Sequence, residues 1–518
     1  MHLSRQFPRP AAAAAGAIAL GVIAHASACA KAVGENGFVG AEDNGVPSDA
    51  GSAGADVVEA STVQPGTDTP PPAPADASPF VFADVSAPPP AHDASTAVSC
   101  TAQGLCVHTC DGGAHTTISG TVYDPAARNP LYDIAVYVPY QTPSPIATGA
   151  SCYRCADLYS GGVIASALTD PAGRFTIVDA PDGQNVPLVV QIGKWRMQYV
   201  LPSVTACQDN PQPDRSLRLP RNHTEGDIPS IAVSTGGADS LECLLRRIGV
   251  DASEYVGGPG GAGRVHVFQG AGGSTTASPA PASPVSLWDS TADLMPYDIV
   301  ALSCEGDETA QPNPPALHDY ANLGGRVFAS HFHYKWFTAT GSPFGAENLA
   351  TWTPGANSMG NPTFALVQTT LPGGAPFPKG QAMNAWLAQV GALAPGGELP
   401  ILGARHNADV AAVNTPSTPW IVADSNASPP GATQYFSWDT PVGSAPEDRC
   451  GRVVYSDLHV GAASGDTIGG VCPASCADND LSPQEKALEF MVFDLSSCLT
   501  PVNVPPPVPE AGPAPTPF

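Results

Sequence analysis

The stretch GGRVFASHFH, residues 324–333, decides how the largest part of this chain folds. Two glycines precede a short apolar run that ends at two histidines, which predicts a buried strand with polar residues at its carboxyl end. The stretches YDIVALSCEG (297–306) and GRVVYSDLH (451–459) have the same character. A helical pattern at 316–323 lies between the stretches 297–306 and 324–333. Such alternation of strands and helices predicts an α/β domain with a doubly wound (flavodoxin-like) parallel sheet over 226–498.

Further strands and helices extend this domain in both directions. Apolar runs predict strands at 228–235 and 265–268. After the first of these, Asp239 and Glu242 are spaced as a capping box, and apolar residues at helical spacing follow as far as Gly249. The stretch SPQE at 482–485 predicts the start of a late helix, again with a capping box and with proline at the first helical position.

The order of these stretches resembles the class I glutamine amidotransferase-like fold, and within it the trehalose-utilisation branch. That resemblance implies a nucleophilic cysteine in a strained turn directly after the strand that ends at Ser330. This chain has His331 there, so we expect no amidotransferase activity. Cys304 follows an earlier strand, and we interpret it as disulfide-bonded or buried.

Four side chains at the ends of two predicted strands form the candidate site. They are His331, His333, Asp457 and His459. Residues two apart on extended backbone share a face, so each pair could project together. Three imidazoles and a carboxylate suit Zn²⁺ or another divalent transition metal that activates water for hydrolysis. The alternative is a polar cleft in which the histidines form local hydrogen bonds.

Two other kinds of site were weighed in this domain. A nucleophilic set of Ser330, His459 and Asp457 is conceivable, but no Gly-x-Ser-x-Gly turn surrounds the serine. The aromatic residues within 420–438 could line a sugar-binding surface, although QYFSW at 434–438 also fits an ordinary strand, which we favour. Met383 and Trp386 lie at helical spacing and indicate a helix with a core-facing side.

Residues 100–225 predict a small all-β sandwich of the transthyretin or immunoglobulin-like kind. Short alternating runs at 117–123, 134–138, 173–177 and 186–192 are separated by Asp, Pro and Gly turns. The motifs GTVYDP (120–125), AVYV (135–138) and TDPAGRF (169–175) resemble the carboxypeptidase regulatory-like domain. That resemblance implies a spacer or adhesive module, so we place no catalytic residue here.

The chain has 13 cysteines, which indicates an oxidising compartment. Twelve remain if Cys29 is set aside, and an even number can pair completely. The pair in CYRC at 152–155 has the spacing of half a zinc site or of a redox pair, but in an exported chain we favour structural disulfides.

The N-terminus predicts export. Residues 1–29 contain two arginines, an apolar run and ASAC at 26–29, which resembles a lipobox with Cys29 as the lipidated residue. The alternative is ordinary cleavage after Ala28. Residues 30–99 are rich in Pro, Ala and Asp and predict a disordered linker, and 499–518 predict a Pro-rich tail.

The charge balance excludes one class of partner. The chain has 21 Lys and Arg against 47 Asp and Glu, and its net charge of -26 repels nucleic acid. The motifs GKW (193–195), EGDIP (225–229), ECLLR (242–246) and EKALEF (485–490) resemble predicted lipoproteins of myxobacterial type. The sequence argues against a tryptophan synthase alpha chain. A (β/α)8 barrel needs about 250 residues of eight strand–helix units, and a cytosolic enzyme has no use for an export signal and twelve cysteines.

Together these observations predict a membrane-anchored lipoprotein of the cell envelope with a non-catalytic binding role, for carbohydrate or cell-wall material. The first alternative is a metal-dependent hydrolase that uses the His/Asp cluster. The second is a purely structural or adhesive surface protein.

Overall fold

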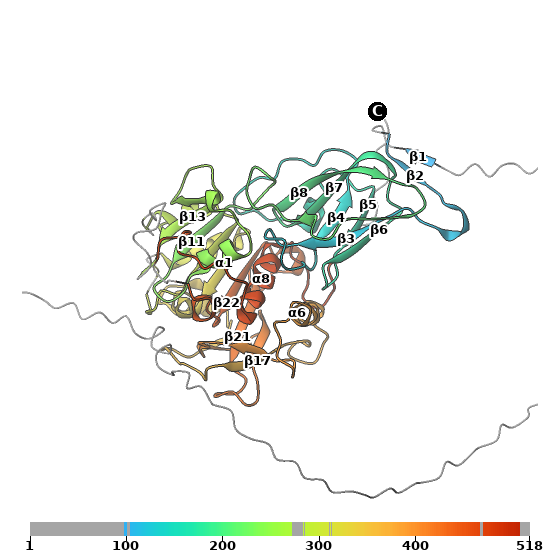
Figure 1. The fold of residues 1–518 in the computed structure, drawn as a ribbon. Coiled ribbons are helices and arrows are strands. Elements are labelled where there is room, and N and C mark those ends of the chain that lie inside the picture. Colours follow the sequence, from blue (N-terminus) through green and yellow to red (C-terminus); the bar gives the residue numbers. More distant parts are fainter. Residues whose placement is uncertain are drawn as a thin grey trace, which may run out of the picture. The chain divides into compact units, whose positions relative to one another are not determined.

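The computed structural model describes residues 98–100, 104–271, 283, 285–309, 311, 313–466 and 470–507 (Figure 1). The export signal, Cys29, the linker up to residue 97 and the last eleven residues of the tail lie outside this part of the chain. The described residues belong to one compact unit. None of its helices is both long and apolar enough to cross a lipid bilayer.

A two-sheet β module forms the N-terminal part. One sheet has the order β10-β3-β6, with β9 paired to β3, and the other has the order β5-β4-β7-β8. Alternating residues of both sheets, such as Ile118 and Val136, are buried in one shared core. The strands are β3 (Thr117–Tyr123), β4 (Ala135–Val138), β5 (Ala165–Leu168), β6 (Arg174–Val178), β7 (Gly183–Ile192), β8 (Trp195–Val204), β9 (Asp209–Pro211) and β10 (Leu217–Arg218). The four strands expected from alternation are therefore confirmed. A short hairpin of β1 (Val98–Cys100) and β2 (Cys106–His108) precedes them.

A ten-stranded mixed sheet dominates the rest of the chain. Its order is β12-β13-β11-β14-β15-β22-β21-β20-β17-β18. The first six strands in that order are mutually parallel, and the last four add in antiparallel fashion. The strands are β11 (Ile231–Thr235), β12 (Tyr255–Gly257), β13 (Val265–Gln269), β14 (Ile299–Leu302), β15 (Arg326–Ser330), β17 (Thr363–Val367), β18 (Leu399–Ile401), β20 (Ser417–Ala423), β21 (Thr433–Thr440) and β22 (Gly451–Ser456).

Helices cover both faces of this sheet. One face packs against α1, α6 and α8, and its core continues into the β module; the other packs against α2 to α5. The helices are α1 (Leu241–Arg247), α2 (Val285–Trp288), α3 (Thr291–Leu294), α4 (Pro314–Asn322), α5 (Tyr334–Thr338), α6 (Pro378–Gln389), α7 (Gly461–Ser464) and α8 (Pro483–Ser496). A small pair of strands, β16 (Thr351–Trp352) and β19 (Ala408–Asp409), lies outside the large sheet.

Two of three expectations about this region need correction. The sheet is mixed and not purely parallel. The prediction missed this because strand–helix alternation does not reveal antiparallel strands that are added as hairpins, such as β20 and β21. The capping box at Asp239 and Glu242 is wrong: Ser240 is the N-cap residue of α1, and the Asp239 carboxylate instead accepts hydrogen bonds from the backbone of Val460 and Gly461. The capping box at Ser482 is confirmed.

Complete pairing of twelve cysteines is also wrong. Five disulfides join Cys100 to Cys106, Cys110 to Cys207, Cys152 to Cys450, Cys155 to Cys498 and Cys243 to Cys476. Cys304 and Cys472 are buried thiols. Parity allows full pairing but does not require it, because a buried thiol is itself a stable small apolar side chain.

The two parts of the unit are fastened through the loop between Cys152 and Cys155. Both cysteines cross to the large-sheet region, over sequence separations of 298 and 343 residues. The buried Lys194 ammonium also contacts the Asp298 carboxylate at 2.6 Å. The motif CYRC is therefore neither a redox pair nor a zinc half-site; its cysteines form the structural disulfides that we favoured.

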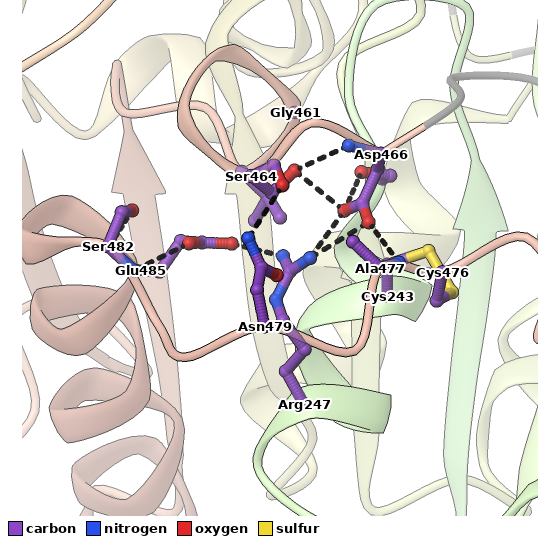
Figure 2. A network of polar contacts seen from close by, with 12 residues as sticks. Cys243, Arg247, Gly461, Ser464, Asp466, Cys476, Ala477, Asn479, Ser482 and Glu485 are labelled. Atoms are coloured by element: carbon purple, nitrogen blue, oxygen red, sulfur yellow. Dashed lines mark hydrogen bonds and ion pairs between the residues drawn. A yellow bond between two sulfur atoms is a disulfide. The ribbon is translucent and has the colours of Figure 1, made fainter.

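A second polar network fastens the segment after β22 to α1 (Figure 2). Arg247 donates to both Asp466 oxygens at 2.8 Å and also forms an ion pair with Glu485. The Ala477 amide donates to Asp466, and the Cys243–Cys476 disulfide lies beside these groups. All three charged side chains are at most 1% exposed.

Candidate metal centre

The candidate site is built at the carboxyl ends of three neighbouring parallel strands. Cys304 follows β14, His331 follows β15 and His459 follows β22. Leu302 is paired with Ala329 in the register of β14 and β15. Cys304 and His331 each come two residues after this pair, just beyond the ends of their strands, and therefore lie side by side.

The side chains of these three residues converge. One ligand atom from each of Cys304, His331 and His459 can be chosen so that all three lie within 4.8 Å of one another. The Cys304 Sγ and the His331 Nδ1 are 3.2 Å apart, and the His331 and His459 rings meet edge to face with centroids 5.0 Å apart. Their exposed fractions are 0%, 0% and 3%, respectively.

Burial keeps these imidazoles neutral. Desolvation lowers the pKa of His331 well below 6.5, and the proximity of His459 and the charge of Arg405 lower it further. Desolvation, followed by the charge of Arg405, lowers the pKa of His459 to about 3. A metal ion binds neutral imidazole and thiolate, so both rings are in the form that a metal requires. The His459 Nε2 is buried and has no hydrogen-bond partner.

The backbone at His331 is strained in a way that projects its ring. His331 has φ +42°, in the left-handed region that a branched or bulky residue seldom adopts. The chain turns there from β15 into a 3-10 turn and then α5. Its carbonyl oxygen accepts a hydrogen bond from the Tyr455 hydroxyl at 2.8 Å. A sharp strand-to-helix turn therefore exists after Ser330, with a histidine where the amidotransferase resemblance implies a cysteine.

His333 does not join the cluster of Cys304, His331 and His459. Its Nδ1 donates to the Ser330 carbonyl at 3.0 Å, and its ring packs edge to face against Trp336. Burial lowers its pKa to about 4. The rule that residues two apart share a face fails here because the chain leaves β15 at Ser330 and turns.

Asp457 lies level with His331 but its oxygens are already used. One accepts from the Asn407 backbone N–H at 2.9 Å, and the other lies 2.9 Å from the Tyr455 hydroxyl oxygen, whose one proton it shares with the His331 carbonyl. Burial raises its pKa to about 7. Asp457 therefore anchors the segment that leads to His459, through Asn407, and contacts Tyr455, which holds the His331 carbonyl. It is not a member of the cluster.

The other weighed sites are not assembled. The Ser330 hydroxyl donates to Asp239 at 3.2 Å rather than to His459, so the nucleophilic set does not form. Trp420, Tyr435 and Trp438 are at most 1% exposed, which agrees with the ordinary strand that we favoured over a sugar-binding surface. Met383 and Trp386 are buried on α6.

The donor set fits a soft or borderline metal. One sulfur and two imidazole nitrogens are ligands of Zn²⁺ and of copper, whereas Mg²⁺ and Ca²⁺ prefer oxygen. Sequence reasoning included His331 and His459 but left out Cys304. The signal in the sequence was that Cys304, like His331, directly follows a predicted strand; the register that places the two side by side comes from the structure.

Comparison with known proteins adds little. No protein-family profile and no curated protein matches this chain. One solved structure is similar to part of it: a chain from a type II cohesin–X-dockerin complex of Acetivibrio cellulolyticus, with 14% identity over 29% of this chain and 88% of that chain, and a TM-score of 0.16. A TM-score this low does not define a shared fold.

Proposed function

We propose that this protein is an exported component of the cell envelope that holds a transition-metal ion, Zn²⁺ in the first instance, on Cys304, His331 and His459. The observation that carries the proposal is the convergence of their three ligand atoms within 4.8 Å. Each residue comes from a separate strand end, so the cluster is a product of the fold and not of local spacing in the chain.

The chemistry of the three groups supports a resident ion. The two imidazoles are neutral, and all three groups are buried. A metal ion that binds them therefore does not have to replace strong hydrogen bonds to water. A metal would also satisfy the buried Nε2 of His459. Burial costs a polar atom free energy unless it has a partner, so such an atom favours a ligand.

Burial favours a binding role over hydrolysis. A metal that activates water for a substrate needs an open coordination position that the substrate can reach. The three side chains are at most 3% exposed. We therefore propose a held metal in an α/β domain of amidotransferase-like type without amidotransferase activity, and the metal-dependent hydrolase becomes the second candidate.

The envelope location rests on separate support. Five disulfides fit a chain that folds in an oxidising compartment. The ASAC stretch at 26–29 resembles a lipobox, and we propose that Cys29 carries the lipid. Mass spectrometry of the N-terminal peptide tests this: a diacylated Cys29 is expected, and a peptide that begins at unmodified Cys29 contradicts it.

The metal proposal is tested on the full chain produced in an oxidising compartment. Elemental analysis should find one transition-metal ion per chain, and Cys304→Ala and His459→Ala should each reduce it at least about tenfold. Replacement by Co²⁺ should add a thiolate-to-cobalt absorption band that is lost in Cys304→Ala.

Two matched variants serve as controls. Cys472→Ala removes the other buried thiol, and His333→Ala removes a buried imidazole that lies outside the cluster. Both should retain the metal. A well-folded protein without stoichiometric metal, or equal loss in the control variants, contradicts the proposal and leaves a structural or adhesive role.

A further inference from the structure

A cavity of about 210 Å³ lies between the large sheet and the segment that follows α8, and none of its lining residues belongs to the metal cluster. One wall is formed by residues of β20 and β21, including Thr418, Ser437 and Asp439. The segment 499–503 forms another part of the lining, and Pro446 and Arg449 form a third. Liquid water occupies about 30 Å³ per molecule, so the cavity has room for about seven waters or for one small organic molecule.

Disulfides hold two of these walls in place. The segment 499–503 begins directly after Cys498, which is bonded to Cys155. Arg449 directly precedes Cys450, which is bonded to Cys152. Arg154, which lies between Cys152 and Cys155 in the chain, donates from Nη1 to the Arg449 carbonyl at 3.1 Å. The CYRC loop therefore fixes both walls before any ligand arrives, and such preorganisation reduces the entropy cost of binding.

Two lining side chains have a buried polar atom without a hydrogen-bond partner, the Trp438 indole N–H and the Thr500 hydroxyl. Thr500 is 8% exposed, and its hydroxyl is buried without a hydrogen bond. Burying a hydroxyl without a partner is costly, so a ligand that bonds to it gains that free energy. Ser437 accepts from the Trp420 indole at 2.9 Å, and its own proton remains to be donated.

The lining favours an uncharged ligand with many hydroxyl groups. Its one carboxylate, Asp439, is already paired with Arg452 at 2.8 Å, and its one cation, Arg449, donates from Nε to the Ser444 carbonyl at 3.1 Å. The remaining polar groups are the indole N–H of Trp438, which only donates, and a set of hydroxyls and one amide, which both donate and accept, as sugar hydroxyls do. The hydroxyls and the amide belong to Thr415, Thr418, Ser437, Thr500 and Asn503, and prolines supply apolar contacts between them.

We infer that this cavity binds a neutral polyol of hexose size, either as a free monosaccharide or as the end of a glycan. The inference does not rest on the metal proposal. The test uses the full chain with its disulfides verified by mass spectrometry. Ligand-observed NMR with D-glucose, D-galactose, D-mannose and N-acetyl-D-glucosamine measures binding of free sugars, and cellotetraose and chitotetraose measure binding of chain ends.

We expect millimolar or tighter binding of at least one of these sugars. Thr500→Val keeps the shape of the side chain but removes the hydroxyl, and it should weaken binding about tenfold. Asn503→Ala alters an exposed residue of the same wall, so it tests the cavity even if Thr500→Val does not fold. A stronger response from the tetrasaccharides identifies glycan ends as the source of the ligand.

One control separates this site from the rest of the molecule. Ser417→Ala removes a buried hydroxyl that also lacks a partner but does not line the cavity, and it should leave binding unchanged. The inference is overturned if the folded protein binds none of the six sugars, since water alone then fills the cavity, or if Thr500→Val and Asn503→Ala bind as tightly as the unmodified chain.

Discussion

Arg247 is a buried cation between two buried carboxylates, so its loss should cost this fold several kcal/mol. Replacing it with methionine leaves Asp466 and Glu485 without their counter-charge, because both are fully buried. Breaking a buried ion pair by removing one partner costs about 3–5 kcal/mol. Arg247→Met should therefore lower the free energy of unfolding by that amount in a urea titration.

Arg128 offers the matched control. Its ion pairs with Asp478 and Asp480 span 3.6 Å, and these aspartates are 98% and 90% exposed. Exposed pairs contribute at most about 1 kcal/mol. Arg128→Met should change the midpoint little, and an equal loss in both variants would mean that the buried network of Figure 2 gives no special stability.

At the scale of elements, the packing of α8 against the end of β3 buries two carboxyl groups together. Asp124 follows β3, and Glu489 lies on α8; both are at most 1% exposed. The Glu489 Oε2 accepts from the Asn129 side chain at 2.7 Å, and Asp124 accepts the amides of Arg128 and Asn129. Burial raises the pKa of both groups, and the charge of Asp124 raises that of Glu489 further.

This pair predicts a pH dependence of stability. Because the folded-state pKa values lie above the ordinary 3.8 and 4.5, the folded protein binds protons more tightly than the unfolded chain. The stabilisation is complete below those ordinary values and is lost as the pH rises through the raised ones. One such proton contributes a slope of about 1.4 kcal/mol per pH unit.

The variant Glu489→Gln tests this pH dependence, because an amide can still accept from Asn129 but cannot ionise. Its free energy of unfolding should fall less than that of the unmodified chain between about pH 4.5 and pH 8, measured by urea unfolding at several pH values. Glu447→Gln changes an exposed residue and should follow the unmodified chain. Parallel curves for the unmodified chain and Glu489→Gln would contradict the prediction.

At the scale of the whole molecule, two disulfides tie the β module to the large sheet. The Cys152–Cys450 and Cys155–Cys498 bonds close loops of 298 and 343 residues. Disulfides that close long loops restrict the unfolded chain most, with typical effects of about 2–4 kcal/mol. The double variant Cys152→Ala/Cys450→Ala should lose that amount of stability in thermal or urea unfolding.

The bond between Cys100 and Cys106 is the comparison for this prediction. It closes a loop of only six residues in the terminal hairpin. Removing it should alter the hairpin and leave the main transition near its original midpoint. A main transition that shifts equally in both double variants would show that loop length does not govern these contributions.

Local signals in the sequence predict much of this fold. The strand at 326–330 and the helix that begins after Ser482 are recovered at their observed bounds, because apolar periodicity and capping are set by neighbours within a few residues. Asp239 shows the limit of such signals. Its spacing to Glu242 suits a cap, but the tertiary fold brings the amides of Val460 and Gly461 to its carboxylate instead.

The candidate site was half predictable for the same reason. His331 and His459 end strands, and adjacent parallel strand ends meet at one edge of a sheet. The turn after Ser330 directs His333 toward Trp336, and Asp457 is taken by Asn407 and Tyr455. Neither outcome can be read from spacing, because each depends on contacts with residues distant in the chain.

The sequence by itself determined the parts: a β module, an α/β region, the cysteine content, and histidines at two strand ends. Only the tertiary structure decided the partners: which cysteines pair, that four antiparallel strands extend the sheet, and that Cys304 meets His331 and His459. The physical reason is range. Hydrophobic periodicity and capping act over a few residues, whereas strand register and side-chain convergence arise when segments tens to hundreds of residues apart are packed together.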